Sequence, residues 1–322
     1  MENEILKVEK LNITIQKQKK VLKIVKDFDL TVKKEEIIGI VGESGSGKSM
    51  SMKAIMNILP EGVRRVANKL SLEDIDLINA GEKKYQKIRG KEIAMIFQDP
   101  MKSLDPIKRI GLQIEEVILR HSNITKKEAR EKAVSLLKKA GITEAEKRIK
   151  QYPHEFSGGM RQRVMIAMAL SCNPEILIAD EPTTALDVTI QAQILKLLLE
   201  IQRENNMSII FITHDMGVIS KICQKVMVMY AGFVVEEGDK KEIFNNPKHP
   251  YTIALLKAVP SLDLNKKRLV AIEGKTPSLN EDFKLCPFLN RCDKKIEICN
   301  EVMPEYKYYG NKQKVKCHIC YE

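Results

Sequence analysis

The chain contains no tryptophan, and aromatic residues make up only 5% of its 322 residues. Proteins that bind single-stranded nucleic acid use aromatic side chains, interleaved with basic ones, as stacking platforms. Here the 54 Lys and Arg residues, which give a formal net charge of +11, are scattered along the chain without that interleaving. The charge therefore indicates a lysine-rich solvated surface, and we expect no nucleic acid among the partners.

Long apolar runs are also missing. No stretch approaches the roughly 20 apolar residues of a membrane-spanning helix, and the start at Met1, Glu2, Asn3 and Glu4 is unlike a secretory signal. With 43% hydrophobic and 30% charged residues, the composition is that of a folded chain rather than a disordered one. We expect a cytoplasmic protein that reaches a membrane only through a partner or a surface contact.

Cysteine is unevenly distributed. In a cytosolic chain seven cysteines are not a disulfide framework, because that compartment keeps thiols reduced. Cys172 and Cys223 lie in apolar stretches and are expected to be small core residues. The other five crowd into the end of the chain, between Cys286 and Cys320. Four thiolates there suit zinc or an iron–sulfur cluster, and spacing alone does not choose between these metals.

Strand and helix signals alternate along most of the chain, which favours an α/β fold with buried parallel strands. Strand patterns occupy residues 5–15, 35–42, 175–180 and 208–215, and helix patterns occupy 49–59 and 126–140. Near residue 250 the sequence becomes rich in Pro, Lys, Asn and Cys. We therefore divide the chain into one domain over residues 1–250 and an extension over residues 251–322.

The segment GESGSGKS matches the G-x-x-x-x-G-K-[ST] phosphate loop and lies between a predicted strand and a predicted helix, as that motif requires. The glycines let the backbone N–H groups face phosphate oxygens, while Lys48 reaches the terminal phosphates and the Ser49 hydroxyl takes a Mg²⁺ position. A chance Gly/Ser loop would lack these flanks. The predicted nucleotide-binding residues here are Gly42, Glu43, Ser44, Gly45, Ser46, Gly47, Lys48 and Ser49.

The segment ILIADE at 176–181 is an apolar strand that ends in two acidic residues. On its own such a run usually marks a strand that meets solvent. Downstream of a phosphate loop it predicts instead that Asp180 lies in the Mg²⁺ shell and that Glu181, beside the attacking water, is the general base.

The segment FSGGMRQR at 156–163 places Ser157, Gly158 and Gly159 at the start of a predicted helix, where an anion can bind. Here the sequence resembles the ABC ATPases, whose signature motif is LSGGQ-like. Phe156 stands in the Leu position and Met160 in the Gln position. The resemblance implies an ABC-type P-loop ATPase domain with a helical signature subdomain. It also implies head-to-tail pairing, in which Ser157 and Gly159 contact the γ-phosphate held by a partner ATPase.

Further matches to this family follow in order along the chain. Gln98 in MIFQDP resembles the Q-loop glutamine, Leu186 and Asp187 in TTALDV resemble the D-loop, and His214 in FITHD resembles the switch histidine. By this resemblance His214 and Gln98 sense the γ-phosphate. The implied cofactors are ATP and Mg²⁺, with Ser49, Gln98 and Asp180 as the Mg²⁺ ligands.

Two positions depart from the family pattern. Family members usually stack adenine on an aromatic side chain near the N-terminus, where this chain has Ile15. An isoleucine can bury the adenine face, but it offers no aromatic stacking, so nucleotide affinity is expected to be weaker. Glu35 stands where the family usually has a turn glycine.

Three local stretches resemble the oligopeptide, dipeptide and nickel importers: QDPMKSLDPI at 98–107, YPHEFSGGMRQRV at 152–164 and HPYTIALLKAVP at 249–260. They imply an ATPase subunit on the cytoplasmic face of the cell membrane that drives uptake of oligopeptides or dipeptides. The implied partners are two transmembrane permeases, a second ABC ATPase that is related or identical, and an extracytoplasmic substrate-binding protein.

The same family often ends in a cysteine pattern that binds a four-iron, four-sulfur cluster. The resemblance therefore implies a 4Fe-4S site at Cys286, Cys292, Cys299 and Cys317, since VKCHIC is similar to the family's Val-x-Cys-His ending. Cys320 is then left over. Zinc and free thiols are the alternatives.

Two other functions remain open. Nickel or another small solute is the alternative cargo. A soluble ABC ATPase in DNA repair or translation is the alternative class, but such proteins usually carry tandem ATPase domains or a coiled-coil insertion, and this chain has one phosphate loop and no heptad insertion.

Overall fold

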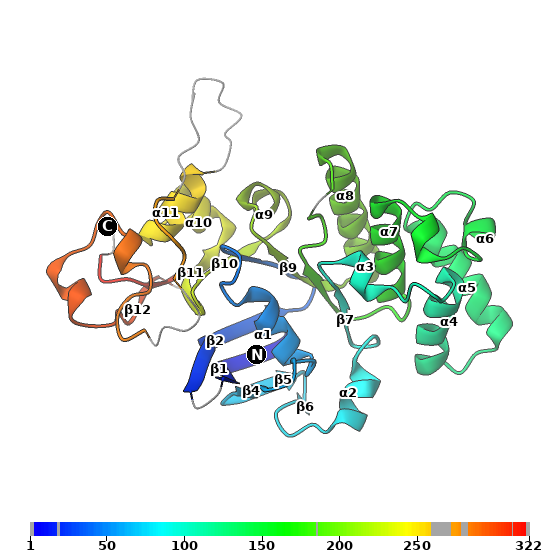
Figure 1. Ribbon diagram of the computed structural model, residues 1–322, viewed down its shortest axis with the longest axis horizontal. Helices are drawn as coiled ribbons and strands as arrows, with labels where there is room; N and C mark the ends of the chain where they lie inside the picture. Colours follow the sequence, from blue (N-terminus) through cyan, green and yellow to red (C-terminus); the bar gives the residue numbers. More distant parts are fainter. Residues whose placement is uncertain are drawn as a thin grey trace. The chain divides into compact units, whose positions relative to one another are not determined.

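The computed structural model describes residues 3–17, 20–184, 186–258, 272–277, 283–310 and 312–319 (Figure 1). The chain divides into two compact units, one of residues 1–79 and 211–322 and the other of residues 80–210. Strand β9 (Ser208–Thr213) crosses that division in sequence. No helix in the described ranges is both long enough and apolar enough to cross a membrane.

The first unit contains an antiparallel sheet with the strand order β2-β1-β5-β6, in which β4 also pairs with β1. The strands are β1 (Glu4–Lys17), β2 (Lys20–Lys33), β4 (Val63–Val66), β5 (Lys69–Leu72) and β6 (Ile75–Asp76). The register sets Leu6 opposite Val32 and Leu72, and all three side chains are buried. Apolar alternation in β1 therefore becomes one buried face of the sheet.

The same unit contains a second group of paired strands. Strand β3 (Ile37–Val41) is buried along its whole length and pairs in parallel with β10 (Lys225–Tyr230), as expected for an apolar run of β-branched residues. Strand β10 continues antiparallel to β11 (Phe233–Asp239), which pairs with β13 (Gln313–Lys316), and β13 pairs with β12 (Tyr306–Tyr309). The C-terminal segment thus adds two strands to this sheet.

The first unit also contains helices, some of which contact these strands. They are α1 (Lys48–Ile55), α9 (Met216–Ile222), α10 (Lys240–Asn245), α11 (Pro250–Lys257) and the 3₁₀ helices η2 (Leu289–Arg291) and η3 (Glu297–Asn300). The helix expected over residues 49–59 ends earlier, at Ile55. The helix ends early because Asn57 has a φ of +54°, which is incompatible with a right-handed helix.

The second unit joins a parallel strand pair to a group of helices. The strands are β7 (Ile93–Ile96) and β8 (Ile176–Asp180). The helices are α2 (Glu82–Ile88), α3 (Pro100–Ser103), α4 (Ile110–His121), α5 (Lys126–Lys139), α6 (Ala145–Arg148), η1 (Pro153–Glu155), α7 (Gly158–Ala169) and α8 (Val188–Asn205). Helices α4, α5 and α7 pack on one another.

Helix α5 closely follows the pattern expected from sequence over residues 126–140. Thr125 and Glu128 form a reciprocal capping box at its start. Ala129, Ala133 and Leu137 lie on one stripe and are fully buried.

Gly42 provides a test of how closely β3 and β10 approach. A Cβ atom at Gly42 would lie 2.1 Å from the Met229 carbonyl oxygen, whereas one at Gly45 would meet nothing within 4 Å. We expect Gly42→Ala to lower the free energy of unfolding by about 3 kcal/mol, because the backbone must shift. Gly45→Ala should cost about 1 kcal/mol, from its positive φ alone. Urea denaturation of the nucleotide-free protein, followed by circular dichroism, measures both losses, and equal losses would contradict the clash.

Candidate functional site

The phosphate loop of the first unit lies between β3 and α1. The Lys48 ammonium is buried and donates to the carbonyl oxygens of Gly42 at 2.6 Å and Glu43 at 2.9 Å, and to the Ser46 hydroxyl at 3.4 Å. Gly47 is the N-cap of α1 with a φ of +101°, a conformation that glycine adopts without strain. The loop therefore curls around the lysine and leads directly into the helix N-terminus, the arrangement that binds phosphate.

The second unit brings three of the acidic and polar motif residues together. Strands β7 and β8 are parallel, with Ile96 opposite Ala179, so their carboxyl ends adjoin. Gln98 follows one strand and Glu181 the other. The Gln98 amide donates to the Glu181 carboxylate over 3.0 Å, and the Thr184 hydroxyl donates to the same oxygen over 2.8 Å.

Asp180 and Glu181 are neighbours with different environments. Asp180 ends β8 and is 2% exposed, while Glu181 is half-buried. Glu181 has a φ of +47°, in the left-handed region that residues other than glycine seldom adopt. Such strain concentrates at functional sites. Glu181 therefore differs from Asp180 both in exposure and in backbone conformation.

The signature segment forms an open helix N-terminus in the second unit. Ser157 is the N-cap of α7 and accepts a hydrogen bond from the Met160 backbone N–H over 3.3 Å. Ser157 and Gly158 are exposed and Gly159 is half-buried, while Phe156 is buried beneath them. Small residues here leave the N–H groups of the first turn accessible to an anion.

Three other predicted residues are exposed or half-buried. Asp187 is exposed and caps α8 by accepting from the Ile190 backbone N–H over 2.9 Å. His214 is exposed where β9 ends, in the first unit. Ile15 is half-buried in β1, opposite Val63 of β4.

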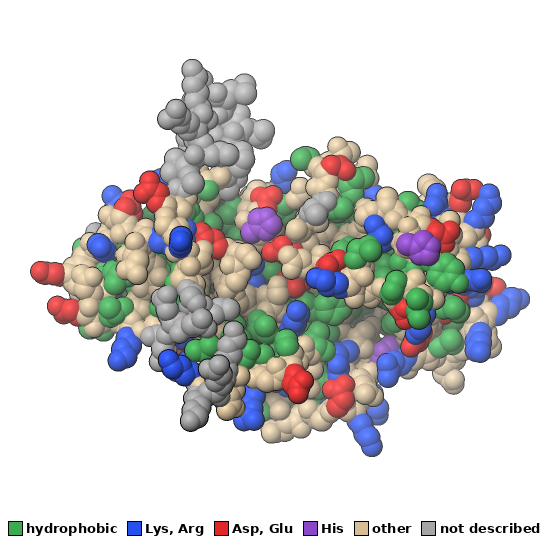
Figure 2. Space-filling model, viewed as in Figure 1, with side chains coloured by type: hydrophobic (Ala, Val, Ile, Leu, Met, Phe, Trp, Pro, Cys, Tyr) green, Lys and Arg blue, Asp and Glu red, His purple; other side chains and the backbone are tan. Residues whose placement is uncertain are grey.

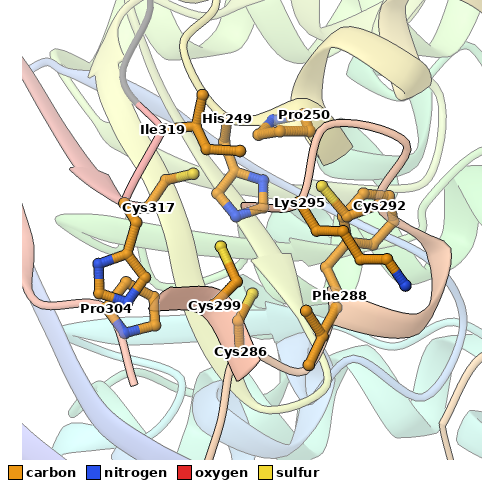
Figure 3. Close-up of a pocket in the computed structure, with 12 residues that line it drawn as sticks. His249, Pro250, Cys286, Phe288, Cys292, Lys295, Cys299, Pro304, Cys317 and Ile319 are labelled. Carbon is orange, nitrogen blue, oxygen red and sulfur yellow. The ribbon is translucent and has the colours of Figure 1, made fainter. Parts of the chain in front are cut away.

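Four cysteines of the C-terminal segment line one pocket of the first unit, together with His249 (Figure 3). They are Cys286, Cys292, Cys299 and Cys317. None of the four forms a disulfide. Burial raises the pKa of the Cys286 thiol to about 11 and also raises that of Cys292. Cys320 lies outside the described residues.

The His249 imidazole lies in the middle of this view, with the four cysteine sulfurs around it (Figure 3). Its Nδ1 accepts from the Tyr251 backbone N–H over 3.1 Å, so the neutral ring carries its proton on Nε2. Burial lowers the pKa of His249 to about 3, which keeps the ring neutral. Nε2 is buried and has no hydrogen-bond partner. Among the residues described, no group of three or more His, Cys, Asp or Glu is placed to hold a metal ion.

Sequence reasoning missed Thr184, His249, Tyr251 and Arg291. Thr184 stands inside the TTALDV segment, and His249 and Tyr251 begin the HPYTIALLKAVP segment, so each was part of a recognised stretch without an assigned role. Arg291 lies in CPFLNRC, in which only the cysteines were assigned a role as metal ligands.

Two protein-family models match the chain. Residues 25–184 match the ABC transporter model, and residues 235–299 match the model described as the oligopeptide/dipeptide transporter C-terminal region. The oligopeptide transport ATP-binding protein OppD of Salmonella typhimurium is 48% identical over 94% of this chain and 90% of its own length. The dipeptide transport ATP-binding protein DppD of Bacillus subtilis is 45% identical over 98% of this chain and 95% of its own.

Solved structures agree. The ATP-binding cassette MJ0796, in a dimeric post-hydrolysis state bound to ADP and Pi, is 27% identical with a TM-score of 0.66, covering 73% of this chain and 98% of its own. The protein cbiO1 from Clostridium perfringens, part of the ABC transporter complex cbiONQ, is 30% identical with a TM-score of 0.62, over 78% of this chain and 93% of its own. The chain has the ABC ATPase cassette fold and belongs to the ABC transporter family, among the ATP-binding proteins of oligopeptide and dipeptide transport.

Proposed function

We propose that the chain is the ATP-hydrolysing subunit of an importer that takes up oligopeptides or dipeptides. The observation that carries the proposal is the extent of the similarity: relatives named for oligopeptide and dipeptide transport match 94% to 98% of the chain, including the region at 235–299. Nickel or another small solute is the alternative cargo. We infer a cassette over residues 1–250 and an importer-type extension over 251–322.

The nucleotide site divides its work among the motifs. ATP and Mg²⁺ are expected for an ABC ATPase. The N–H groups of residues 42–49 and the Lys48 ammonium would hold the phosphates. By the family resemblance, the Ser49 hydroxyl, the Gln98 amide oxygen and the Asp180 carboxylate would be the Mg²⁺ ligands, and the ion would neutralise developing charge on the phosphates. Ile15 would cover the adenine.

Glu181 would be the general base. Its carboxylate is held by Gln98 and Thr184 in a defined direction, which favours orientation of a water for attack on the γ-phosphate. His214 and Gln98 would each sense the γ-phosphate. Ser157, Gly158, Gly159 and Asp187 are exposed or half-buried, as residues must be if they complete the site of a second ABC ATPase.

The permeases would dock on the second unit. Met101, Ile107 and Leu112 are 59%, 83% and 51% exposed within one short stretch beside the Gln98 segment. Contiguous exposed apolar side chains mark interaction sites, and these three lie close together in sequence. Docking there would place the subunit on the cytoplasmic face of the cell membrane, below an extracytoplasmic substrate-binding protein. Basic and acidic side chains are interspersed over the face seen in Figure 2.

The cysteine pocket would hold a 4Fe-4S cluster. Four thiols line one pocket, and the Nε2–H of His249 lacks a partner among them, so it could donate to a cluster sulfur. When bound, the cluster would cross-link the segments that carry its cysteines. Zinc and free thiols remain the alternatives.

Glu181→Gln tests the base. We expect ATP to bind as tightly as in the wild type while turnover falls about 100-fold or more, because the amide cannot accept a proton. Binding is measured by titration with a fluorescent ATP analogue and turnover by phosphate release. Glu200→Gln, at an exposed carboxylate on α8, is the matched control and should keep full turnover. Retained turnover in Glu181→Gln refutes its role.

Metal analysis tests the cluster. Protein purified without oxygen should contain about four irons and four acid-labile sulfides per chain. Cys292→Ser should lower both contents, whereas Cys172→Ser, which lies outside the pocket, should leave them unchanged. Zinc without sulfide would establish the zinc alternative. If the protein contained neither iron nor zinc, the cysteines would be free thiols.

Ile107→Glu tests the docking surface. Affinity purification of the tagged chain from solubilised membranes should recover two permeases and a second ATPase with the wild type. A carboxylate placed on the apolar patch should reduce permease recovery about tenfold, because docking would bury it. Val66→Glu, on β4 and 70% exposed, is the control and should recover the wild-type set. Equal losses in both variants would contradict docking at this patch.

A further inference from the structure

Glu43 is the second residue of the phosphate loop, and residues beyond position 250 hold both its backbone and its side chain. The Glu43 backbone N–H donates to the Tyr251 hydroxyl over 2.9 Å. Its carboxylate accepts two hydrogen bonds from the Arg291 guanidinium, at 2.7 Å and 3.0 Å, and a third from the Thr276 hydroxyl at 2.9 Å. The carbonyl oxygen of the same residue accepts from the Lys48 ammonium.

Arg291 is itself held firmly. Besides Glu43, its guanidinium donates to the carbonyl oxygens of Ile272 and Glu273 and to the Tyr230 hydroxyl. Its side chain is only 6% exposed. A forked, bidentate pair with so many additional bonds is strong and directional, unlike an exposed ion pair.

The ion pair between Arg291 and Glu43 also determines the charge of the Glu43 carboxylate at the phosphate loop. Partial burial raises the pKa of Glu43, but the hydrogen bonds from Arg291 and Thr276 together lower it by more than burial raises it. The pKa therefore lies below its ordinary value, and the carboxylate stays charged. A nucleotide on this loop brings several negative charges close to Glu43. Without a cation beside it, the carboxylate would repel the phosphates.

We propose that Arg291 is a positioning residue of the nucleotide site, which acts through Glu43 to hold the phosphate loop in its binding conformation and to cancel the carboxylate's repulsion of ATP. The proposal rests on the ATPase activity proposed above, and not on the cluster. The C-terminal segment thus takes part in nucleotide binding. Arg291 directly precedes Cys292, which lines the cysteine pocket.

A set of variants tests this role by titration with a fluorescent ATP analogue. Arg291→Ala should weaken ATP binding about tenfold, because the carboxylate is left unpaired beside the phosphates. Adding Glu43→Gln to Arg291→Ala should restore most of the affinity, since the repelling charge is gone. Arg291→Lys keeps the charge without the fork and should lose about threefold. In turnover assays the loss should appear in the KM for ATP, with kcat nearly unchanged.

Lys314→Ala is the matched control, because Lys314 also joins the C-terminal segment to the rest of the unit, through an ion pair with Asp29 that does not touch the loop. Its ATP affinity should equal that of the wild type. Unchanged affinity in both Arg291→Ala and Arg291→Lys would overturn the proposal, as would a loss that Glu43→Gln does not relieve. Failure of the proposed ATPase would look different, since the wild type itself would then neither bind nor hydrolyse ATP.

Discussion

The close approach of Gly42 to the Met229 carbonyl is the constraint on which the phosphate loop depends. It occurs where β3 leaves its parallel partner β10, so the loop starts against the backbone of a neighbouring strand. The residue after Met229 is Tyr230, which packs on Tyr251 and Phe288. The loop is therefore supported on one side by residues of the C-terminal half of the chain, and not only by its own turns.

The second unit uses the same principle of adjoining strand ends. Strands β7 and β8 are buried and pair in parallel, and parallel pairing places the residues that follow them next to each other. The Gln98 to Glu181 hydrogen bond follows from that register. The strand that precedes the strained Glu181 is buried along its whole length.

The C-terminal segment is part of the fold as well as of the proposed chemistry. Strand β13 pairs with β11, and Gln313 donates to the buried Glu236 carboxylate at 2.7 Å. That carboxylate also accepts the backbone N–H groups of Lys248 and His249, at the start of the segment that leads to α11. The cysteine pocket is thus built on the sheet that carries the phosphate loop, which explains how Arg291 can reach Glu43.

The sequence by itself determined those features that depend on short local motifs. A phosphate loop, an acidic strand end and a Ser-Gly-Gly helix start each depend on backbone conformations set within about ten residues, so they were recognisable along the chain, and the family followed from their order. Helix α5 was predictable for the same reason. Only the tertiary structure decided which distant side chains meet. Arg291 and Glu43 are 248 residues apart in sequence, and Gln98 and Glu181 are 83 residues apart. Strand pairing and packing bring these residues together, and no local sequence pattern predicts it. The orphaned Nε2 of His249 was likewise invisible in sequence, because burial and the loss of hydrogen-bond partners are properties of the packed chain.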